Sequence, residues 1–341
     1  MTSNQTVTVF GAYGHTGRFV VSELRKRGWT PILSGRDYEK LNAIGAPQGL
    51  NIRPASVDAP ESLDHALVGA AAVINCAGPF AYTFAPVIEA ALRAHIPYLD
   101  VTAELEVAAA EFEQYANRAR TAGILIVPTM AFYGGLGDLL ATAAMGDWSA
   151  ADEISLAYAL NSWKPTPGTR ATIRTSMQRR GGRRPVLSNK RIEFRIDSAP
   201  IVDWTFPSPI GTQRVVAEFT TTDSVTIPRH LRTTEISTYM TLAPLKDLSD
   251  PDLSPPAGVD ESGRSSQTFL LEAVARLGNA ERRAVARGRD IYAVTAPLVV
   301  EATQRVVTRL TEKTGVCAAG EIFEARDFLR VLCPAHLSLE L

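Results

Sequence analysis

The chain has 341 residues, enough for two domains with separate hydrophobic cores. Its formal net charge is −1 and 21% of its residues are charged, which is typical of globular proteins and excludes disordered and fibrous classes. A net charge this small also argues against a general binder of nucleic acid or membrane surfaces. The 3 cysteines lack C-x-x-C spacing, so we expect a reducing compartment and no metal site. Without a signal pattern or a run of transmembrane length, a cytoplasmic protein with no membrane insertion is predicted.

A glycine-rich motif lies close to the N-terminus. The β-branched and aromatic run Val7 to Phe10 predicts a buried strand, and a helical pattern begins a few residues later. Between them, Gly11, Gly14 and Gly17 allow a tight turn in which the backbone approaches a pyrophosphate at the helix N-terminus. A glycine-rich turn without a ligand is the alternative. We favour nucleotide binding because the motif falls in the first strand–helix unit.

The end of the second strand bears on the choice between NAD and NADP. Sites that prefer NAD place an acid here, about 20 residues after the glycines, to bind the ribose 2′-hydroxyl. This chain has Arg36 instead, and Arg18 directly follows the glycine motif. Two guanidinium groups favour a 2′-phosphate, so NADP(H) is the predicted cofactor. Asp37 speaks against this interpretation, and a solvated surface arginine is the alternative.

Strand and helix patterns alternate up to residue 127, which predicts a Rossmann-type, doubly wound parallel sheet. Ala71 to Asn75 is a buried strand followed by a loop of small residues, where cofactor and substrate meet in such sheets. Asp58 could touch the adenine or cap the helix that begins at Pro60. The predicted cofactor-binding residues are Gly11, Tyr13, Gly14, His15, Thr16, Gly17, Arg18, Ser34, Gly35, Arg36, Asp58, Cys76, Ala77, Gly78 and Pro79.

Several segments share the pattern of one known family: Gly11 to Arg18, Ser34 to Arg36, Asn75 to Phe80, Tyr98 to Glu104, Val127 to Phe132 and, more weakly, Arg287 to Tyr292. Together they resemble the saccharopine dehydrogenase-like oxidoreductases. The resemblance implies an NADPH-dependent enzyme that transfers hydride to a C=N bond, because the best-known members make or break secondary amines. Ala103 departs from the glycine that many relatives have there.

The second half of the chain changes character. Alternating apolar residues predict strands at 154–158, 191–196, 213–219 and 234–242, and a hairpin over 268–290 that turns at Gly278-Asn279. Thr295 is predicted to cap a further helix, and the family resemblance implies that this helix returns to the nucleotide domain. We therefore predict a discontinuous Rossmann domain, 1–148 and 291–341, and an inserted α+β domain, 149–290, with a mainly antiparallel sheet. That inserted domain would bind substrate, and by analogy it would pair two copies in a homodimer.

A basic run at Arg179, Arg180, Arg183 and Arg184 suggests a nucleic-acid site at first sight. Interleaved aromatic residues are absent, so a solvated loop is the better interpretation and no nucleic-acid partner is predicted. An anionic carrier or substrate tail is the minority alternative.

Candidate proton-handling residues follow the fifth strand and the adjoining loops. They are Asp100, Glu104, Tyr82 and Tyr133, although carboxylates at this edge of a sheet also serve as helix caps or ribose ligands. Trp163, Trp204 and Phe206 favour a small, largely apolar substrate. We expect an imine reductase of a biosynthetic pathway. A trans-acting enoyl (C=C) reductase on a carrier-bound or lipid substrate and a non-catalytic NADPH-sensing protein are the alternatives.

Overall fold

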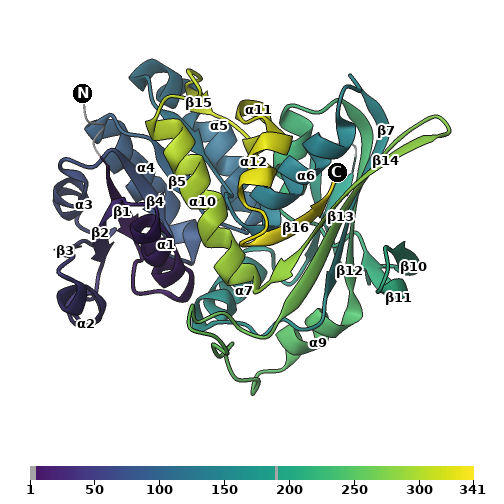
Figure 1. Ribbon diagram of the computed structural model, residues 1–341, viewed down its shortest axis with the longest axis horizontal. Helices are drawn as coiled ribbons and strands as arrows, with labels where there is room; N and C mark the ends of the chain where they lie inside the picture. The colour runs from purple at the N-terminus through teal and green to yellow at the C-terminus, as the bar shows by residue number, and fades with distance from the viewer. Residues whose placement is uncertain (1–4, 189–190) are drawn as a thin grey trace. The chain divides into compact units, whose positions relative to one another are not determined.

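The computed structural model describes residues 5–188 and 191–341 (Figure 1). Contacts divide the chain into two compact units, each built from two segments. The first unit comprises Met1–Ala131 and Thr295–Ile322, and the second comprises Phe132–Val294 and Phe323–Leu341. Within the described ranges, we find no helix both long and apolar enough to cross a membrane.

The first unit is built on a seven-stranded parallel sheet in the order β15-β6-β5-β4-β1-β2-β3. Its strands are β1 (Thr6–Phe10), β2 (Thr30–Gly35), β3 (Asn51–Pro54), β4 (Ala72–Asn75), β5 (Tyr98–Asp100), β6 (Leu125–Val127) and β15 (Gly315–Val316). Its helices are α1 (His15–Lys26), α2 (Tyr38–Gly45), η1 (Ala46–Gln48), α3 (Pro60–Leu67), α4 (Phe80–Ala94), α5 (Leu105–Ala122) and α11 (Ala319–Ile322). The strand order reverses between β1 and β4, and ligands bind at such a reversal in doubly wound sheets. This confirms the predicted Rossmann-type fold.

The β1–α1 unit follows from its apolar pattern. Val7 and Val9 of β1 are fully buried, and Val20 and Leu24 give α1 an apolar face four residues apart in the sequence. Basic side chains occupy the last turn of α1, where they complement the negative end of the helix dipole. The turn between the two elements is therefore held at both ends by core residues.

The second unit is built on a seven-stranded mixed sheet in the order β10-β11-β12-β7-β13-β14-β16, with a separate β8–β9 hairpin. Its strands are β7 (Ala151–Leu160), β8 (Arg184–Ser188), β9 (Arg191–Arg195), β10 (Ile201–Phe206), β11 (Gly211–Ala217), β12 (Thr233–Thr241), β13 (Thr268–Leu277), β14 (Ala280–Arg289) and β16 (Leu337–Glu340). Its helical segments are η2 (Phe132–Leu136), α6 (Gly137–Met145), α7 (Pro167–Arg179), α8 (Asp223–Thr226), η3 (Ile227–Arg229), α9 (Leu242–Ser249) and α12 (Ala325–Val331). Only β7 and β12 pair in parallel among these described strands, so the mainly antiparallel sheet is confirmed.

The long β13–β14 hairpin, green in Figure 1, turns where the sequence predicted it. Leu277 pairs with Ala280 across the turn, and Gly278 has a φ of 57°, in the left-handed region that favours glycine. A glycine followed by asparagine is a strong local signal for such a two-residue turn.

The observed division of the chain differs from the predicted domain bounds 1–148, 149–290 and 291–341. Helix α6 packs against β13 and β14, so residues from 132 onward belong to the second unit. At the other end, β16 pairs with β14, with Leu337 opposite Gly288. The last 19 residues, Phe323–Leu341, therefore return to the second unit. The predicted pattern lacked this closing strand.

Helix α10 (Ile291–Val307) begins earlier than predicted. The carboxylate of Asp290 caps it by accepting hydrogen bonds from the backbone N–H groups of Tyr292 and Ala293, both 3.0 Å. The predicted cap Thr295 therefore lies inside the helix. The boundary between the two units also falls within α10.

Candidate functional site

The glycine motif forms a tight turn between β1 and α1. Gly11 has a φ of 87°, and a Cβ atom at this position would lie 2.8 Å from the backbone N of Ala77 and the backbone C of Cys76. At Gly17 a Cβ atom would overlap the carbonyl oxygen of Gly11. Side chains at these positions would push the turn apart. The structure therefore brings the predicted 11–17 and 76–77 segments together, at the carboxyl edge of the sheet.

The N-terminus of α1 is suited to an anion. Gly14 is the N-cap residue, and no side chain in the described part of the chain caps the helix there. The first turn carries no acidic residue either. Backbone N–H groups and the positive end of the helix dipole thus remain available for a phosphate. This is the arrangement expected where a pyrophosphate binds.

Basic side chains lie near Tyr13, which follows β1, and near the end of β2. Arg18 and Arg36 are exposed, and within the described residues neither has an ion pair. The Nε of Arg18 donates to the carbonyl oxygen of Tyr13 (3.1 Å), and the ammonium of Lys40 lies 5.7 Å from the centre of the Tyr13 ring. Lys40 was not among the predicted site residues, although its position in the first turn of α2 places it near Arg36. These three cations suit a 2′-phosphate.

Asp37, the residue that spoke against NADP, has another role. Its carboxylate caps α2 by accepting from the backbone N of Lys40 (3.1 Å) and forms an ion pair with the Lys40 ammonium (2.9 Å). The hydrogen bond from Lys40 lowers the pKa of Asp37, so the group is an anion that serves the helix. The acid next to Arg36 is thus engaged within its own helix.

Two further predicted cofactor residues, Ser34 and Asp58, have different surroundings. The carbonyl oxygen of Ser34 accepts hydrogen bonds from the backbone N of Gly11 (2.8 Å) and of Ala12 (3.2 Å). The Ser34 hydroxyl is buried and has no partner among the described residues. Buried hydroxyls are usually hydrogen-bonded, so this one could bind a ligand or a water molecule. Asp58 is exposed and hydrogen bonds only with Ser56 in the described chain, while Ala59 is the N-cap of α3. The helix-cap alternative for Asp58 is therefore wrong, and its adenine role stays a prediction.

The loop after β4 is held by Asn75. Its amide Nδ2 donates to the Thr83 hydroxyl and to the Tyr98 hydroxyl, both 3.2 Å, and its Oδ1 accepts from the backbone N of Ala77 (3.0 Å). Burial raises the pKa of the Cys76 thiol, which favours its neutral form over the thiolate. Of the predicted residues 76–79, Cys76 and Ala77 lie directly against Gly11 of the glycine turn.

Glu104 caps a helix. Its two carboxylate oxygens accept hydrogen bonds from the backbone N–H groups of Phe80 (2.6 Å) and Ala81 (3.0 Å), the first residues of α4. Its side chain is buried. A carboxylate at a helix N-terminus is stabilised by those N–H groups and by the helix dipole. The structure therefore supports the helix-cap interpretation that the sequence left open.

Asp100 connects the ends of two strands. Its Oδ1 accepts from the backbone N of Thr102 (2.9 Å) and of Thr129 (2.8 Å), and its Oδ2 accepts from the Tyr98 hydroxyl (3.0 Å). Glu111 lies beside it, and burial raises the pKa of Glu111 well above its ordinary value. A protonated Glu111 next to an ionised Asp100 avoids two buried charges. These contacts hold the carboxyl ends of β5 and β6 together inside the protein.

The two predicted tyrosines have opposite environments. Tyr82 is 61% exposed at the start of α4. Tyr133 is buried in the kinked segment η2, where it stacks on Trp163 with ring centres 5.0 Å apart. The Tyr133 hydroxyl is buried and has no partner in the described part of the chain. Of the four candidates for proton handling, Tyr133 alone combines burial with an unused hydroxyl.

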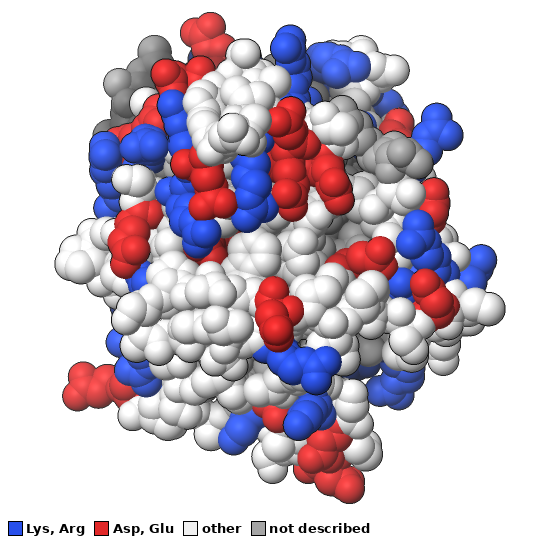
Figure 2. All heavy atoms as spheres, turned by 90° about the vertical axis from the view of Figure 1, so that its right-hand side faces the viewer, with Lys and Arg blue, Asp and Glu red and all other residues white. Residues whose placement is uncertain are grey.

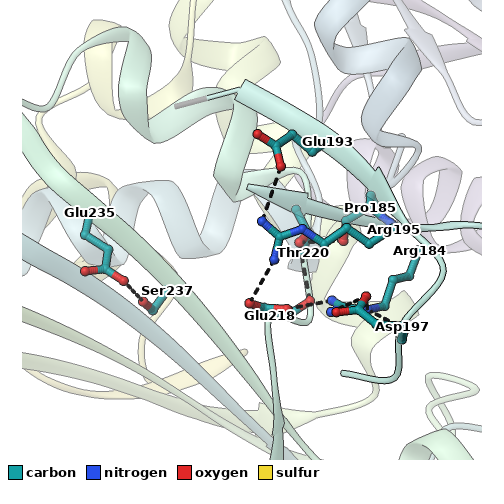
Figure 3. Close-up of polar contacts among 9 residues, drawn as sticks. All are labelled: Arg184, Pro185, Glu193, Arg195, Asp197, Glu218, Thr220, Glu235 and Ser237. Atoms are coloured by element: carbon teal, nitrogen blue, oxygen red, sulfur yellow. Dashed lines mark hydrogen bonds and ion pairs between the residues drawn. The ribbon is translucent and has the colours of Figure 1, made fainter. Parts of the chain in front are cut away.

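Arg184, the last residue of the basic run, is paired with acidic residues of the second unit (Figure 3). Arg184 begins β8 and forms ion pairs with Asp197 (2.9 Å) and Glu218 (2.7 Å). Arg195 on the paired strand β9 reaches Glu193 (3.2 Å) and the other oxygen of Glu218 (3.6 Å). Arg179 ends α7, so the predicted loop is confined to the turn between α7 and β8. On the face shown in Figure 2, cations and anions alternate, which is typical of a solvated surface.

These features define a dinucleotide-binding α/β protein whose cofactor site is shaped for a 2′-phosphate. Residues 7–127 match the family described as saccharopine dehydrogenase NADP binding domain. This match confirms the predicted resemblance over these residues and the predicted cofactor NADP(H).

Known proteins extend this similarity to different degrees. The chain is 28% identical over 145 residues to a saccharopine dehydrogenase-like oxidoreductase of Bos taurus, which covers 37% of this chain and 34% of that protein. It is 30% identical over 142 residues to a probable mitochondrial saccharopine dehydrogenase-like oxidoreductase of Arabidopsis thaliana, covering 37% of this chain and 31% of that one. The chain therefore spans about a third of the length of these curated relatives.

A solved structure is similar over nearly the whole chain. It is the saccharopine dehydrogenase (L-Glu forming) of Saccharomyces cerevisiae, with a TM-score of 0.66 and 12% sequence identity. The match covers 98% of this chain and 99% of that one. At this identity the match shows a shared fold, which includes the mixed sheet of the second unit.

Proposed function

We propose that the protein is an NADPH-dependent oxidoreductase that transfers hydride to the carbon of a C=N bond. The observation that carries the proposal is the glycine turn at the N-terminus of α1, with three cations beside it. The names of the curated relatives, which are oxidoreductases, support the same reaction class.

The residues of the first unit fit the cofactor. The glycines allow the tight turn that would present backbone N–H groups to a pyrophosphate, since a Cβ atom at Gly11 or Gly17 would clash with backbone atoms and distort the turn. Arg36 and Lys40 would hold the 2′-phosphate by charge-assisted hydrogen bonds. NADPH when bound supplies the hydride, and the protein's part is to bind and orient the cofactor.

Reduction of an imine is proposed ahead of reduction of an enoyl group. The resemblance to saccharopine dehydrogenases supports a nitrogen-containing substrate. Aromatic side chains of the second unit, among them Tyr133, Tyr158 and Trp163, support a largely apolar one. Tyr133 is the proposed proton-handling residue because its hydroxyl is unused, whereas Asp100 and Glu104 hold the fold together.

NADPH oxidation by the purified full chain tests the reaction. The absorbance of NADPH should fall only when a cyclic imine is added, and not with an enoyl thioester. Turnover of the enoyl thioester and not of the imine would show that the protein reduces a C=C bond, and would contradict the proposed imine reduction. Tight NADPH binding without turnover of any imine, enoyl or ketone would favour a non-catalytic NADPH-binding protein.

The cofactor assignment has its own test. Replacing Arg36→Ala removes a charged contact worth roughly 1.5–3 kcal/mol, so the dissociation constant for NADPH should rise roughly ten- to hundredfold while that for NADH changes little. Lys40→Ala should act in the same direction with a smaller effect, because its ammonium is already paired with Asp37. Arg93→Ala, at another exposed arginine of the same unit, is the control. Equal losses for NADPH and NADH in the Arg36→Ala variant would overturn the 2′-phosphate assignment.

A further inference from the structure

A buried carboxylate lies at the start of α8 in the second unit. Asp223 is fully buried and accepts hydrogen bonds from the hydroxyls of Tyr158 and Thr221, both 2.6 Å, and from the backbone N of Gly134 (3.0 Å). All three donors are neutral. Burial raises the pKa of Asp223 to about 6, so the group is mostly an anion at neutral pH.

Asp223 differs in its charge balance from two other buried carboxylates of this unit, Asp138 and Glu272. Asp138 is paired with the ring Nε2 of His230 (2.6 Å), and Glu272 is paired with Arg283 (2.7 Å). No Lys, Arg or His among the described residues forms an ion pair with Asp223. Buried charges in proteins are normally paired, because an uncompensated one is costly. A cationic ligand would supply the positive charge that the described residues do not provide.

The surroundings of Asp223 are aromatic. The Tyr158 ring, whose hydroxyl binds Asp223, lies 5.1 Å from the centre of the Tyr133 ring. Tyr133 in turn stacks on Trp163, and its ring centre is 6.4 Å from that of Phe219. Trp163 is only half-buried, so this cluster extends from the protein surface to Asp223. Faces of tyrosine and tryptophan attract organic cations, most strongly where water is excluded.

Three buried hydroxyls on the segments that carry this site have no partner among the described residues. Tyr133, Thr222 and Ser224 each have a buried hydroxyl without a partner among the described residues, and all three side chains are more than nine-tenths buried. Two of them flank Asp223 in the sequence. Buried polar groups are nearly always hydrogen-bonded, so orphaned hydroxyls on the two segments that meet at this carboxylate support a site for a polar ligand.

The backbone is shaped to admit the carboxylate. Gly134 has a φ of 98°, a conformation that favours glycine, and it directs its N–H group to Asp223. A Cβ atom on Gly137 would overlap the Asp223 Oδ1 atom and would lie 3.0 Å from the Tyr158 hydroxyl. The segment 134–137 thus carries glycine at both positions where this site requires it.

From these observations we propose that Asp223, with the aromatic rings of Tyr133, Tyr158 and Trp163, binds an organic ammonium or iminium group. The cation supplies the positive partner that the Asp223 carboxylate lacks. The orphaned hydroxyls bind the N–H groups of the cation or its neighbouring polar atoms. Identifying this cation with the nitrogen of the reduced substrate rests on the proposed function. The binding site itself does not, because every group in it belongs to the second unit.

Binding of benzylammonium to the full chain tests the site without any turnover. Isothermal titration should give an affinity at pH 8 at least tenfold higher than that of benzyl alcohol, a neutral compound of similar shape. Asp223→Asn should remove this preference, and Tyr158→Phe should weaken it while the carboxylate remains. Glu153→Gln, at an acid paired with Arg276 elsewhere in this unit, should bind like the wild type.

The pH dependence gives a second readout. A carboxyl with a pKa near 6 is about 10% ionised at pH 5, so benzylammonium affinity should fall roughly tenfold between pH 8 and pH 5. Tyr158 of β7 and Tyr133 of η2 face Asp223, and the Asp138–His230 pair lies on α6 and the segment after η3. Protonation of His230 would persist in the Asp223→Asn variant, so a pH dependence retained there would assign the effect to His230 and overturn the proposal.

The outcomes separate this inference from the proposed function. Equal binding of benzylammonium and benzyl alcohol, or unchanged binding in a folded Asp223→Asn variant, would overturn the cation site. NADPH titration of the same samples reports on the first unit independently. A cation site that depends on Asp223 in a protein that reduces no imine would uphold the inference and contradict the proposed function.

Discussion

The two candidate sites of this molecule are opposite in charge and in exposure. The cofactor turn presents exposed cations and backbone N–H groups, which suit a phosphate that stays partly hydrated. The Asp223 site presents a single buried anion inside an aromatic cluster, which suits a cation stripped of water. A hydride donor that carries phosphates and an acceptor that carries nitrogen would need these two opposite environments.

The sites also differ in what holds them in shape. Backbone contacts shape the cofactor turn, since Gly11 and Gly17 touch main-chain atoms. Side-chain hydrogen bonds hold Asp223 in place, through Tyr158 and Thr221. A small change in the first site should therefore act by steric overlap, whereas one in the second should act through charge. Variants that impair one site should leave ligand binding at the other unchanged.

The largest effect is expected from Gly17→Ala. The added Cβ atom overlaps the carbonyl oxygen of Gly11, a backbone atom that cannot move without opening the turn. We expect the NADPH dissociation constant to rise by roughly a hundredfold, in line with an overpacking cost of about 1–3 kcal/mol. Fluorescence titration with NADPH measures it, and benzylammonium binding should stay at the wild-type value.

Gly49→Ala is the matched control for that variant. Gly49 has a positive φ, 62°, and an added Cβ atom there meets nothing within 4 Å, whereas at Gly17 it overlaps a backbone oxygen. It should cost about 1 kcal/mol of stability through backbone strain and leave NADPH affinity unchanged. Similar losses of NADPH binding in both variants would mean that general destabilisation, and not the shape of the turn, explains the result.

The second prediction concerns stability and the charge of Asp223. Its pKa is about 6 in the folded chain, compared with an ordinary value of 3.8. At a pH between these two values, the folded state keeps a proton on Asp223 that the unfolded state has already lost. The contribution of Asp223 to the free energy of unfolding therefore falls as pH rises from about 4 to above 6. The difference of about two pKa units corresponds to up to roughly 3 kcal/mol.

Urea denaturation of the wild type and of Asp223→Asn at pH 4, 6 and 8 measures this change. The stability of the wild type relative to the variant should decrease along the series, because the asparagine carries no charge at any of these pH values. Parallel stability curves would show that Asp223 keeps an ordinary pKa and that its charge is compensated. The same result would weaken the contrast between the two sites.

The two sites were not equally visible in the sequence. The cofactor turn was predicted because its signals lie within 30 residues, from a strand through Gly17 to Arg36. Lys40 was missed, although a lysine in the first turn of the helix after Arg36 was a usable signal. Asp223 could not be found, since its partners Tyr158 and Gly134 lie 65 and 89 residues away. Its local sequence shows only a polar turn.

The fold, too, was predictable in its local elements but not in its long-range contacts. Alternation of strands and helices predicted the parallel sheet, and the glycine at 278 predicted the β13–β14 turn. The bounds of the units were displaced because they depend on long-range pairing. Nothing near Leu337 indicates that it will lie opposite Gly288, and nothing near α6 indicates that it will pack on β13. Periodicity specifies an element, but its neighbours are selected by contacts distant in the chain.

The smallest effect is expected from Glu104→Gln, which tests whether this buried acid is a cap or a proton donor. Glutamine keeps one acceptor for the backbone N–H groups of Phe80 and Ala81 but loses the negative charge at the N-terminus of α4. We expect a loss of about 1 kcal/mol in the free energy of unfolding, with turnover of the imine within a fewfold of the wild type. Glu61→Gln, in the first turn of α3, is the control for loss of an exposed charge at a helix start. A fall in turnover of a hundredfold or more with NADPH affinity and folding intact would make Glu104 the proton donor, and the chemistry would then belong to the first unit.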